Sequence, residues 1–277
     1  MKFALVTTVY NEESNIRNFL SSYLNQTVYA DEFVILDGGS TDNTVFILKE
    51  FSKAYPFLNI NIIVDERCSK KVSKGAIAKG RNIAISNTSK SSDYIVVTDA
   101  GCLLEKRWFE EIIKPFYKGA ELVCGYYSIL VENDFDRKYS KIFLPKNDNF
   151  LPSSRSFAFK KECWEAVGGY PEETYTAEDT FFDLKLIDKK YKMLRAPKAI
   201  VYWKIAKDEN DLRKKIYAYG YGEGMLHLYK LRYLFRLFSL VIPIYPLIHS
   251  QGLALCYKFY FYQVRGYLAG LLYSCKR

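Results

Sequence analysis

The run Tyr94-Ile-Val-Val-Thr-Asp-Ala-Gly-Cys102 decides how this chain folds. Its apolar residues are typical of a strand that is buried on both faces, as in a parallel sheet. Asp99 follows at the strand's end and stands before two small residues, Ala100 and Gly101. Ligands bind at the carboxyl ends of parallel strands, and small neighbours let a metal ion or a phosphate approach. We therefore expect a ligand site at Asp99.

Strand and helix patterns alternate in the hundred residues around that run. Strands are predicted over residues 3–9, 32–37 and 59–65, and helices over 15–24, 41–51 and 75–86. This alternation indicates an α/β fold with a Rossmann-like parallel sheet. Right-handed crossovers bring all the strand ends to one edge, so Asp37 should converge on Asp99, with Thr8 and Tyr10 beside them.

The rest of the chain divides into a mixed part and a tail. Helices are predicted over residues 108–116, 161–167 and 176–187, and strands over 122–131, 152–159 and 191–205. The polar segment 133–149 shows little periodicity, which predicts a loop over the site. We expect one domain over residues 1–205 and a basic, hydrophobic helical appendage over 206–277.

Composition restricts the class of protein. The six cysteines are scattered without a Cys-x-x-Cys pair, which fits a reducing compartment and argues against a zinc site or a disulfide framework. The two histidines cannot build a His-rich metal site. The first residues run straight into a strand pattern, so we do not expect a cleaved signal peptide.

The tail carries the positive charge and the longest apolar run. Residues 189–236 hold thirteen bases against four acids, roughly the whole net charge of +9. Such an excess suits nucleic acid, an acidic substrate or an anionic membrane, and the uncharged run 237–257 that follows favours the membrane. That run is long enough to span a bilayer. The run is interrupted by polar or helix-breaking residues, so an interfacial or re-entrant segment is predicted as strongly as a span: these residues are Pro243, Pro246, His249 and Gln251. The alternative to membrane association is a soluble appendage or an oligomer contact.

The sheet edge has the residues of a nucleotide site, although the common phosphate loops are missing. No Gly-x-Gly-x-x-Gly or P-loop follows the first strand. Asp37 could instead hydrogen-bond a ribose or a base edge, and Tyr10 could stack on the base. Lys79 and Arg81 could reach a pyrophosphate. The alternative is that a lone strand-end aspartate only caps a turn.

Four motifs, in order, resemble those of family 2 glycosyltransferases. They are Thr7-Thr-Val-Tyr-Asn-Glu12, Val34-Ile-Leu-Asp-Gly-Gly-Ser-Thr-Asp-Asn-Thr44, Gly80-Arg-Asn-Ile-Ala-Ile85 and Thr98-Asp-Ala-Gly-Cys102. The resemblance covers residues 1–205 and implies the nucleotide-diphospho-sugar transferase (GT-A) fold, a mixed sheet flanked by helices. It implies that a nucleotide-sugar donor is bound near Arg81 and Asn82. The residues implied to hold the nucleoside are Thr8, Tyr10, Glu12 and Asp37.

One motif departs from the family pattern. The family commonly has Asp-x-Asp at this strand end, whereas the variant Asp99-Ala100-Gly101 supplies one acid. A divalent cation such as Mg²⁺ or Mn²⁺ needs oxygen ligands, but it can take several from water and from substrate phosphates. We therefore still expect a divalent cation on Asp99. A water-mediated role for Glu105 or another acid stays open.

A second pair of acids predicts the acceptor side. Glu178 and Asp179 open a predicted helix, where acids favour the helix dipole without any further role. The resemblance implies more: they match the family's acceptor-side Glu-Asp motif, which makes both of them candidate catalytic residues, and Asp179 matches its general base. Arg155 matches a position near the active site, on the acceptor side. No second carboxylate nucleophile is evident, which indicates inversion at the sugar.

The function predicted on this basis is an inverting glycosyltransferase. It would act at the cytoplasmic face of a membrane on a hydroxyl of a lipid-linked or cell-envelope glycan, with segment 237–275 as its anchor. A degenerate sugar-nucleotide-binding scaffold and a sugar-phosphate nucleotidyltransferase are the alternatives. Nucleic-acid binding has no recognisable module to support it.

Overall fold

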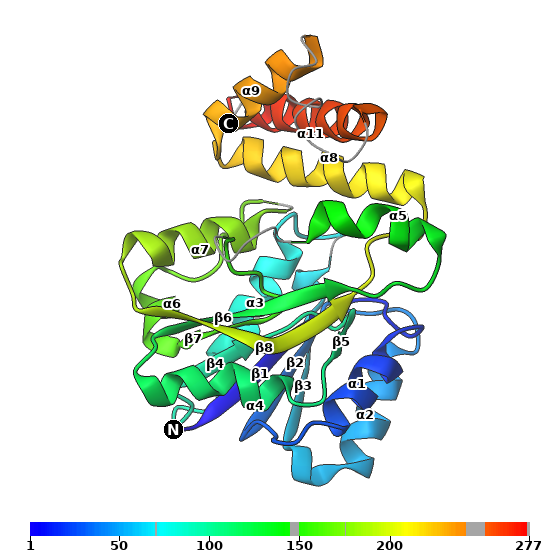
Figure 1. The fold of residues 1–277 in the computed structure, drawn as a ribbon. Helices are drawn as coiled ribbons and strands as arrows, with labels where there is room; N and C mark the ends of the chain where they lie inside the picture. The colour runs from blue at the N-terminus through cyan, green and yellow to red at the C-terminus, as the bar shows by residue number, and fades with distance from the viewer. Residues whose placement is uncertain (70, 145–149, 175, 242–252, 276–277) are drawn as a thin grey trace.

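The computed structural model describes residues 1–69, 71–144, 150–174, 176–241 and 253–275. In these ranges one mixed sheet of eight strands lies at the centre, with helices on both faces and a helical region stacked at one end (Figure 1). The strands are β1 (Phe3–Val9), β2 (Glu32–Asp37), β3 (Ile60–Val64), β4 (Tyr94–Val97), β5 (Cys102–Leu104), β6 (Leu122–Ile129), β7 (Phe157–Lys160) and β8 (Met193–Trp203). Their order across the sheet is β3-β2-β1-β4-β7-β6-β8-β5.

The first four strands form the parallel half of the sheet. β1 pairs in parallel with β2 and β4, and β2 pairs in parallel with β3. The connecting helices are α1 (Ile16–Leu24), α2 (Thr44–Ala54) and α3 (Ala76–Ser86). The apolar residues of β4 are at most 1% exposed, which confirms a strand buried on both faces. The carboxyl ends of these strands share one edge, as the crossover rule predicts.

The other half of the sheet is mixed. β7 lies antiparallel to both β4 and β6, and β8 lies parallel to β6 and antiparallel to β5. The helices of this part are α4 (Trp108–Ile113), α6 (Lys161–Ala166) and α7 (Glu178–Asp188). The predicted α/β mixed sheet flanked by helices is confirmed. Strand β5 was not predicted, because a strand this short depends on its pairing with β8 rather than on a local pattern.

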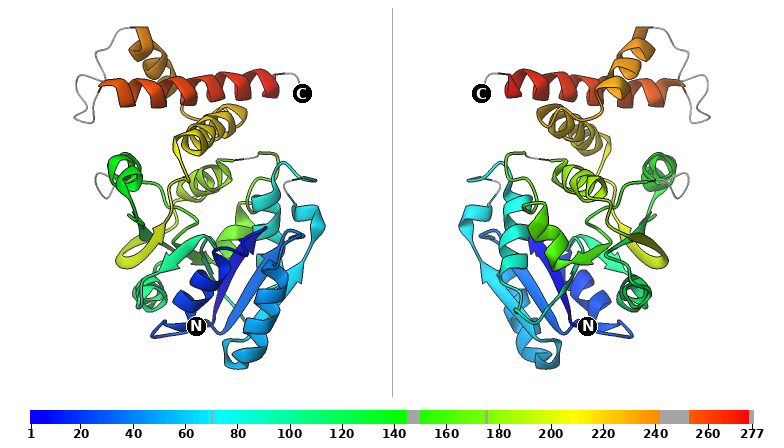
Figure 2. Two further views of the ribbon diagram at one scale, coloured as in Figure 1. Left: turned by 90° about the vertical axis from the view of Figure 1, so that its right-hand side faces the viewer. Right: turned by 90° about the vertical axis from the view of Figure 1, so that its left-hand side faces the viewer.

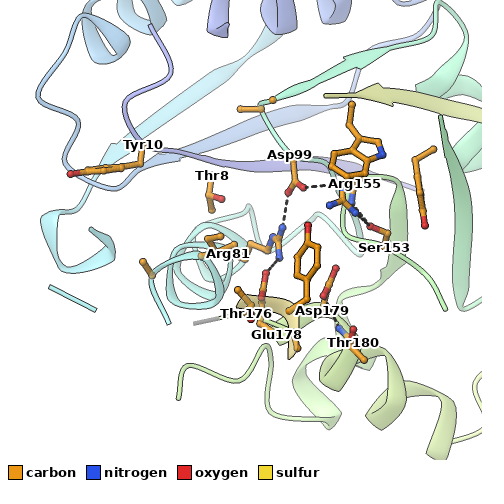
Figure 3. A pocket seen from close by; sticks show the side chains of 18 of the residues that line it. Thr8, Tyr10, Arg81, Asp99, Ser153, Arg155, Thr176, Glu178, Asp179 and Thr180 are labelled. Carbon is orange, nitrogen blue, oxygen red and sulfur yellow. Dashed lines mark hydrogen bonds and ion pairs between the residues drawn. The ribbon is translucent and has the colours of Figure 1, made fainter. Parts of the chain in front are cut away.

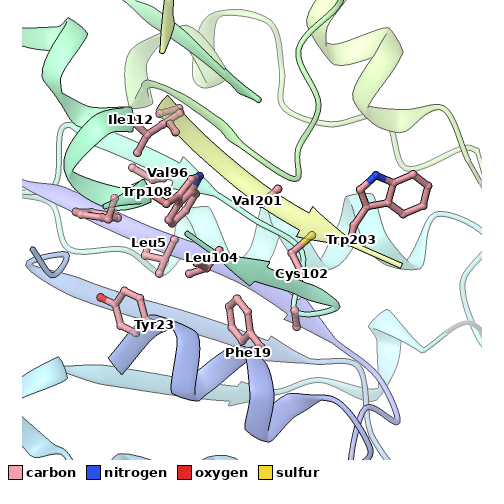
Figure 4. Packing of buried hydrophobic residues seen from close by; sticks show 14 of the residues in the cluster. Leu5, Phe19, Tyr23, Val96, Cys102, Leu104, Trp108, Ile112, Val201 and Trp203 are labelled. Atoms are coloured by element: carbon pink, nitrogen blue, oxygen red, sulfur yellow. The ribbon is translucent and has the colours of Figure 1, made fainter. Parts of the chain in front are cut away.

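A continuous core fixes the sheet to the helices on one face. Trp108 of α4 is fully buried among side chains from the sheet and α1, including Leu5 and Phe19 (Figure 4). Its indole nitrogen donates to Ser156 Oγ at 2.9 Å, so its polar atom is satisfied in the core. On the other face Tyr170 stacks on Phe182 of α7 with ring centroids 4.0 Å apart. These contacts hold the start of α7 beside the strand ends.

The predicted loop over residues 133–149 is wrong for its first part. Helix α5 (Asp134–Phe143) lies there, and Asn133 caps it by accepting the Asp136 amide at 2.9 Å. Its apolar positions are aromatics at a spacing of four residues, which a mainly charged segment conceals: Phe135, Tyr139 and Phe143. Tyr139 and Phe143 both contact Phe259, so packing against a distant helix stabilises α5. Residues 145–149 lie outside the described part.

Three further helices stack beyond α5 and α7 (Figures 1 and 2). They are α8 (Glu209–Met225), α9 (Lys230–Val241) and α11 (Leu253–Ser274). The glycines of α8 let α11 approach it closely. A Cβ on Gly220 would stand 2.1 Å from the Gln263 carbonyl oxygen, and one on Gly224 would stand 2.2 Å from that of Tyr267.

The predicted membrane segment is only partly described. Residues 242–252 of the uncharged run, with Pro243, Pro246, His249 and Gln251, lie outside the described residues. Across the helices that are described, none is both long and apolar enough to pass through a bilayer.

Candidate active site

A cavity of about 550 Å³ opens at the carboxyl ends of β1 and β4. Thr8 and Tyr10 line one end of it, Asp99 lies in the middle, and Arg155 lies at the other end (Figure 3). The first turn of α7 lies across from Asp99, and α8 and α11 add further side chains to the wall. The cavity is therefore enclosed by the sheet edge on one side and by C-terminal helices on the other.

Asp99 is presented to this cavity between two guanidinium groups. Its side chain is 37% exposed, and Oδ1 accepts a hydrogen bond from Arg81 Nη2 at 2.6 Å. Arg155 Nε lies 4.0 Å from Oδ2. The preceding residue holds the strand end in place, since Thr98 Oγ1 donates to the Arg155 carbonyl at 2.8 Å. The two guanidinium groups beside this acid are the kind of donors that attract the oxygens of a diphosphate.

Arg81 links the strand end to the start of α7. Its side chain is 5% exposed, and Nη1 donates to Glu178 Oε1 at 2.9 Å. Burial alone would lower the pKa of Arg81, but attraction by Asp99 and Glu178 raises it above its usual value. Burial and the neighbouring Asp179 raise the pKa of Glu178 to about 7, against the opposing effect of Arg81. Glu178 therefore forms a buried ion pair with Arg81 at the start of α7.

Asp179 has the more open position of the two acids. It is half-buried and lines the cavity, and its Oδ1 accepts the Thr180 amide at 2.8 Å. The residue before the helix, Ala177, has a φ of 66°, a conformation that costs energy without glycine and that often occurs at functional sites. Helix α8 holds the turn before α7 in place, because Thr176 Oγ1 donates a hydrogen bond to the Ala218 carbonyl of α8.

Arg155 lies in an aromatic wall at the far end of the cavity. Its guanidinium carbon is 4.2 Å from the Trp203 ring centroid and 5.6 Å from that of Tyr127. Nη1 also donates to Ser153 Oγ at 3.0 Å. The flat rings and the fixed cation form a surface suited to the faces and hydroxyls of a sugar.

The structure does not place Asp37 at the cavity surface. The residue is fully buried, and its carboxylate accepts the amides of Gly39 at 2.9 Å and Ser40 at 2.7 Å, as well as the Ser40 hydroxyl at 2.5 Å. Gly39 has a φ of 79°, which folds the turn back over the carboxylate. Asp37 therefore shapes the turn that contributes Gly38 to the lining.

Two more of the predicted residues, Lys79 and Asn82, lie outside the cavity lining. Asn82 donates to the Tyr170 carbonyl at 2.9 Å and accepts the Tyr170 amide at 2.9 Å, so it fastens the turn before α7. Lys79 is half-buried on α3. The cavity does contain eight predicted residues: Thr8, Tyr10, Glu12, Arg81, Asp99, Arg155, Glu178 and Asp179.

Three of the lining residues that the sequence did not single out come from the C-terminal helices. They are Tyr219 and Glu223 of α8 and Gln263 of α11. Glu223 accepts a hydrogen bond from the Tyr233 hydroxyl of α9, and burial raises its pKa. These residues belong to no local motif. They reach the cavity because α8 and α11 pack closely together at their glycines.

Few side chains in the described part of the cavity are placed to bind a metal cation. Within the described ranges, no group of three or more His, Cys, Asp or Glu side chains is arranged to hold a metal ion. Asp99 offers one carboxylate, and only its Oδ1 is hydrogen-bonded to Arg81. This fits a cation that keeps several waters and takes the remaining oxygens from a diphosphate.

Comparison with known proteins decides the family. Residues 4–170 match the family described as "Glycosyl transferase family 2", more than half of the chain. The chain belongs to glycosyl transferase family 2. The match includes the strand ends, Arg81 and Arg155, and it stops before Asp179.

Two relatives by sequence and one solved structure are similar to this chain. The O-antigen chain rhamnosyltransferase RfbN of Salmonella typhimurium is 26% identical over 217 residues, which cover 73% of this chain and 66% of that protein. Glycosyltransferase AglE of Haloferax volcanii is 24% identical, with 86% and 78% covered. The chain thus spans about two thirds of the length of the rhamnosyltransferase.

Mannosyltransferase PcManGT from Pyrobaculum calidifontis, solved with GDP-Man and Mn²⁺, superposes with a TM-score of 0.70 at 16% identity, covering 98% of this chain and 87% of that one. The predicted family and its GT-A fold are confirmed.

Proposed function

We propose that the chain is an inverting glycosyltransferase that moves a sugar from a nucleotide-diphosphate donor to a hydroxyl of a lipid-linked or cell-envelope glycan. The observation that carries the proposal is one cavity in a family 2 fold that joins Asp99, two arginines and Asp179. The similarity to an O-antigen chain rhamnosyltransferase supports an acceptor of this class.

The donor would lie along the sheet edge. Tyr10 and Thr8 would take the nucleoside, with Glu12 beside them. Arg81 would face the diphosphate, and Arg155 would lie on the acceptor side. Asp37 would act through its turn and Asn82 through the turn before α7, while Lys79 would add positive charge nearby. Fixed cations at the diphosphate stabilise the charge that grows on it as it departs.

We also propose that a divalent cation, Mg²⁺ or Mn²⁺, binds at Asp99. The Mn²⁺ and GDP-Man bound to the mannosyltransferase of similar fold support this assignment. When bound, such an ion supplies Lewis-acid stabilisation of the leaving diphosphate. Asp99 would hold it by one carboxylate, and Arg81, 2.6 Å from that carboxylate, would keep the side chain oriented.

Asp179 is the general base of this proposal. It would accept the proton of the acceptor hydroxyl as that oxygen attacks the anomeric carbon. The other acids that line the cavity in the described part are engaged: Asp99 and Glu178 with Arg81, Glu223 with Tyr233, and Glu12 with Asn15. No carboxylate is then left to form a covalent sugar intermediate, so the reaction is a single displacement that inverts the sugar.

The experiment is a donor panel of UDP-, GDP- and dTDP-sugars, with and without Mg²⁺ or Mn²⁺, in detergent with a lipid extract. Release of one nucleoside diphosphate that requires Asp99 supports the proposal, and NMR of the product should show an inverted anomeric centre. A retained configuration contradicts the single displacement. Pyrophosphate release would point to a nucleotidyltransferase. Nucleotide binding without turnover would point to a sugar-nucleotide-binding scaffold.

We also propose the arrangement of the chain in the cell. Residues 1–205 would form the catalytic domain at the cytoplasmic face of a membrane. Residues 206–277 would associate with that membrane, and segment 237–275 would provide the contact.

A further inference from the structure

Helix α9 has one apolar face that nothing covers in the described structure. Its exposed side chains are Leu231 (72%), Leu234 (49%), Phe235 (68%) and Phe238 (60%). Their spacing places them on one side of a helix. On the opposite side Tyr233 is 3% exposed and stacks on Tyr267 of α11 with centroids 3.7 Å apart. The helix is therefore fixed by one side and leaves its larger apolar side in water.

Helix α11 has a second exposed stripe. Phe261, Leu268 and Leu272 are 50%, 46% and 67% exposed. Exposed Arg265 lies in the same stripe at helical spacing. The opposite side packs on α8, where a Cβ on Gly266 would stand 2.1 Å from the Tyr217 carbonyl oxygen. The stripe thus faces away from α8, and α11 lies on the outer side of the molecule (Figure 2).

The charged side chains that α9 and α11 themselves carry are all positive. The described ranges of α9 and α11 contain no aspartate or glutamate. Lys230, Arg232 and Arg265 are exposed, and none of them pairs with a carboxylate in the described part of the chain. On α9, Lys230 and Arg232 lie about 100° to either side of Leu231. Apolar side chains flanked by cations match the acyl region and the phosphates of an anionic lipid surface.

We propose that the outer face of α9 and α11 lies flat on an anionic phospholipid surface. We define this lipid-facing surface by Leu231, Leu234, Phe235 and Phe238 of α9 and by Phe261, Arg265, Leu268 and Leu272 of α11. The inference rests on the proposed function for its purpose, which is to bring the cavity to an acceptor held in the membrane. It extends the contact beyond segment 237–275 to the start of α9 at Leu231, and it places that contact on exposed helix faces rather than on a span of residues 237–257.

The same helices connect this surface to the cavity. Helix α8 contributes Tyr219 and Glu223 to the lining, and α11 contributes Gln263. Glu223 is hydrogen-bonded to Tyr233 of α9. A Cβ on Gly222 would stand 2.2 Å from the Thr176 carbonyl oxygen, so α8 is also seated tightly against the turn before α7. Docking on lipid would therefore hold the cavity at a fixed position relative to the membrane.

The test is co-sedimentation of the full chain with vesicles of phosphatidylcholine alone or with about one third phosphatidylglycerol. We expect binding to the anionic vesicles that weakens with salt. Phe235→Gln with Phe238→Gln should weaken it at least about tenfold, because both rings are then replaced by polar groups. Lys230→Gln with Arg265→Gln should weaken it and reduce its salt dependence. The matched control is Phe46→Gln on α2, whose ring is 62% exposed in the catalytic part, and it should bind as the parent does.

Three results would overturn the inference. They are no binding of the parent to either vesicle, equal binding by the Phe235→Gln/Phe238→Gln variant, and a dimer in sedimentation equilibrium that this variant dissociates. In the last case a second copy of the chain covers the face. Thermal melting with nucleoside diphosphates in the absence of vesicles separates this test from the proposed function. Nucleotide binding without vesicle binding overturns this inference alone, and vesicle binding without nucleotide binding or sugar transfer overturns the proposed function alone.

Discussion

Strands β2 and β4 both end a buried apolar run at an aspartate, yet the two carboxylates have opposite surroundings. Asp37 is fully buried and accepts three hydrogen bonds from its own turn. Asp99 is 37% exposed, lines the cavity and is hydrogen-bonded to Arg81. The residues that follow explain the difference, because the turn after Asp37 folds its amides back over the carboxylate, whereas Ala100 and Gly101 after Asp99 do not. An acid at a strand end thus locates the sheet edge without revealing whether the fold or a ligand uses it.

The acids in the first turns of α7 also differ in their surroundings. Glu178 is buried against Arg81, whereas Asp179 is half-buried and lines the cavity. One turn further, Asp183 is buried with both carboxylate oxygens unpaired in the described structure. The acids that the fold satisfies should therefore affect stability when changed, and the acids left available should affect turnover.

The largest effect is expected at Asp179. Asp179→Asn keeps the size of the side chain but removes the base, so we expect turnover to fall about a thousandfold. Donor binding should stay within a few fold, which calorimetry with the nucleotide would measure. Asp188→Asn, on the exposed last residue of the same helix, is the matched control and should leave turnover unchanged. Loss of donor binding in Asp179→Asn would remove it from the role of base.

Asp99→Asn should have the next largest effect. The amide can still contact Arg81 but is a weaker cation ligand, so we expect turnover to fall about a hundredfold and the Mn²⁺ concentration for half-maximal activity to rise. The free energy of unfolding should change by less than about 0.5 kcal/mol, since the side chain is partly exposed. Asp93→Asn, on an exposed residue just before β4, is the control. A large loss of stability in Asp99→Asn would place Asp99 with Asp37 among the acids that the fold needs.

Asp37→Asn should give the reverse result. Its amide nitrogen cannot accept all the donors that now converge on the carboxylate, so the free energy of unfolding in urea should fall by about 2 kcal/mol. Turnover of the folded protein should stay within a few fold, because the carboxylate does not line the cavity. Unchanged stability together with lost nucleotide binding would instead show that Asp37 contacts the donor, as the family resemblance implies.

The sequence predicted the parallel half of the sheet well because its signals are local. Apolar runs and alternating helices placed β1, β2 and β4 within about two residues, and the crossover rule oriented their ends. The antiparallel part was harder, since β5 depends on pairing with β8, and α5 depends on packing its aromatic face against Phe259.

The cavity shows the same limit. Motif residues at strand ends and at the start of α7 were predictable, and the structure brings eight of them together. The motifs could not show that the side chains of Asp37 and Asn82 bind neighbouring turns instead of lining the cavity, because these hydrogen bonds form only in the folded chain. Tyr219, Glu223 and Gln263 carry no pattern at all, since glycine contacts between distant helices place them there.

Asp183, which no motif marks, provides the most specific test, because its effect is a dependence of stability on pH. Burial, with Asp179 adding to it, raises the pKa of Asp183 well above its usual 3.8. The native state then holds a proton that the unfolded chain has lost, so stability is greatest below about pH 4 and falls as pH rises toward the native pKa. Asp183→Asn cannot ionise and should lose this decline, which amounts to at most about 1.4 kcal/mol per pH unit. Urea unfolding from pH 4 to 8 would measure it, with Asp188→Asn as the control. Parallel pH profiles for the parent and Asp183→Asn would mean that Asp183 finds a partner or water in solution and belongs with the satisfied acids.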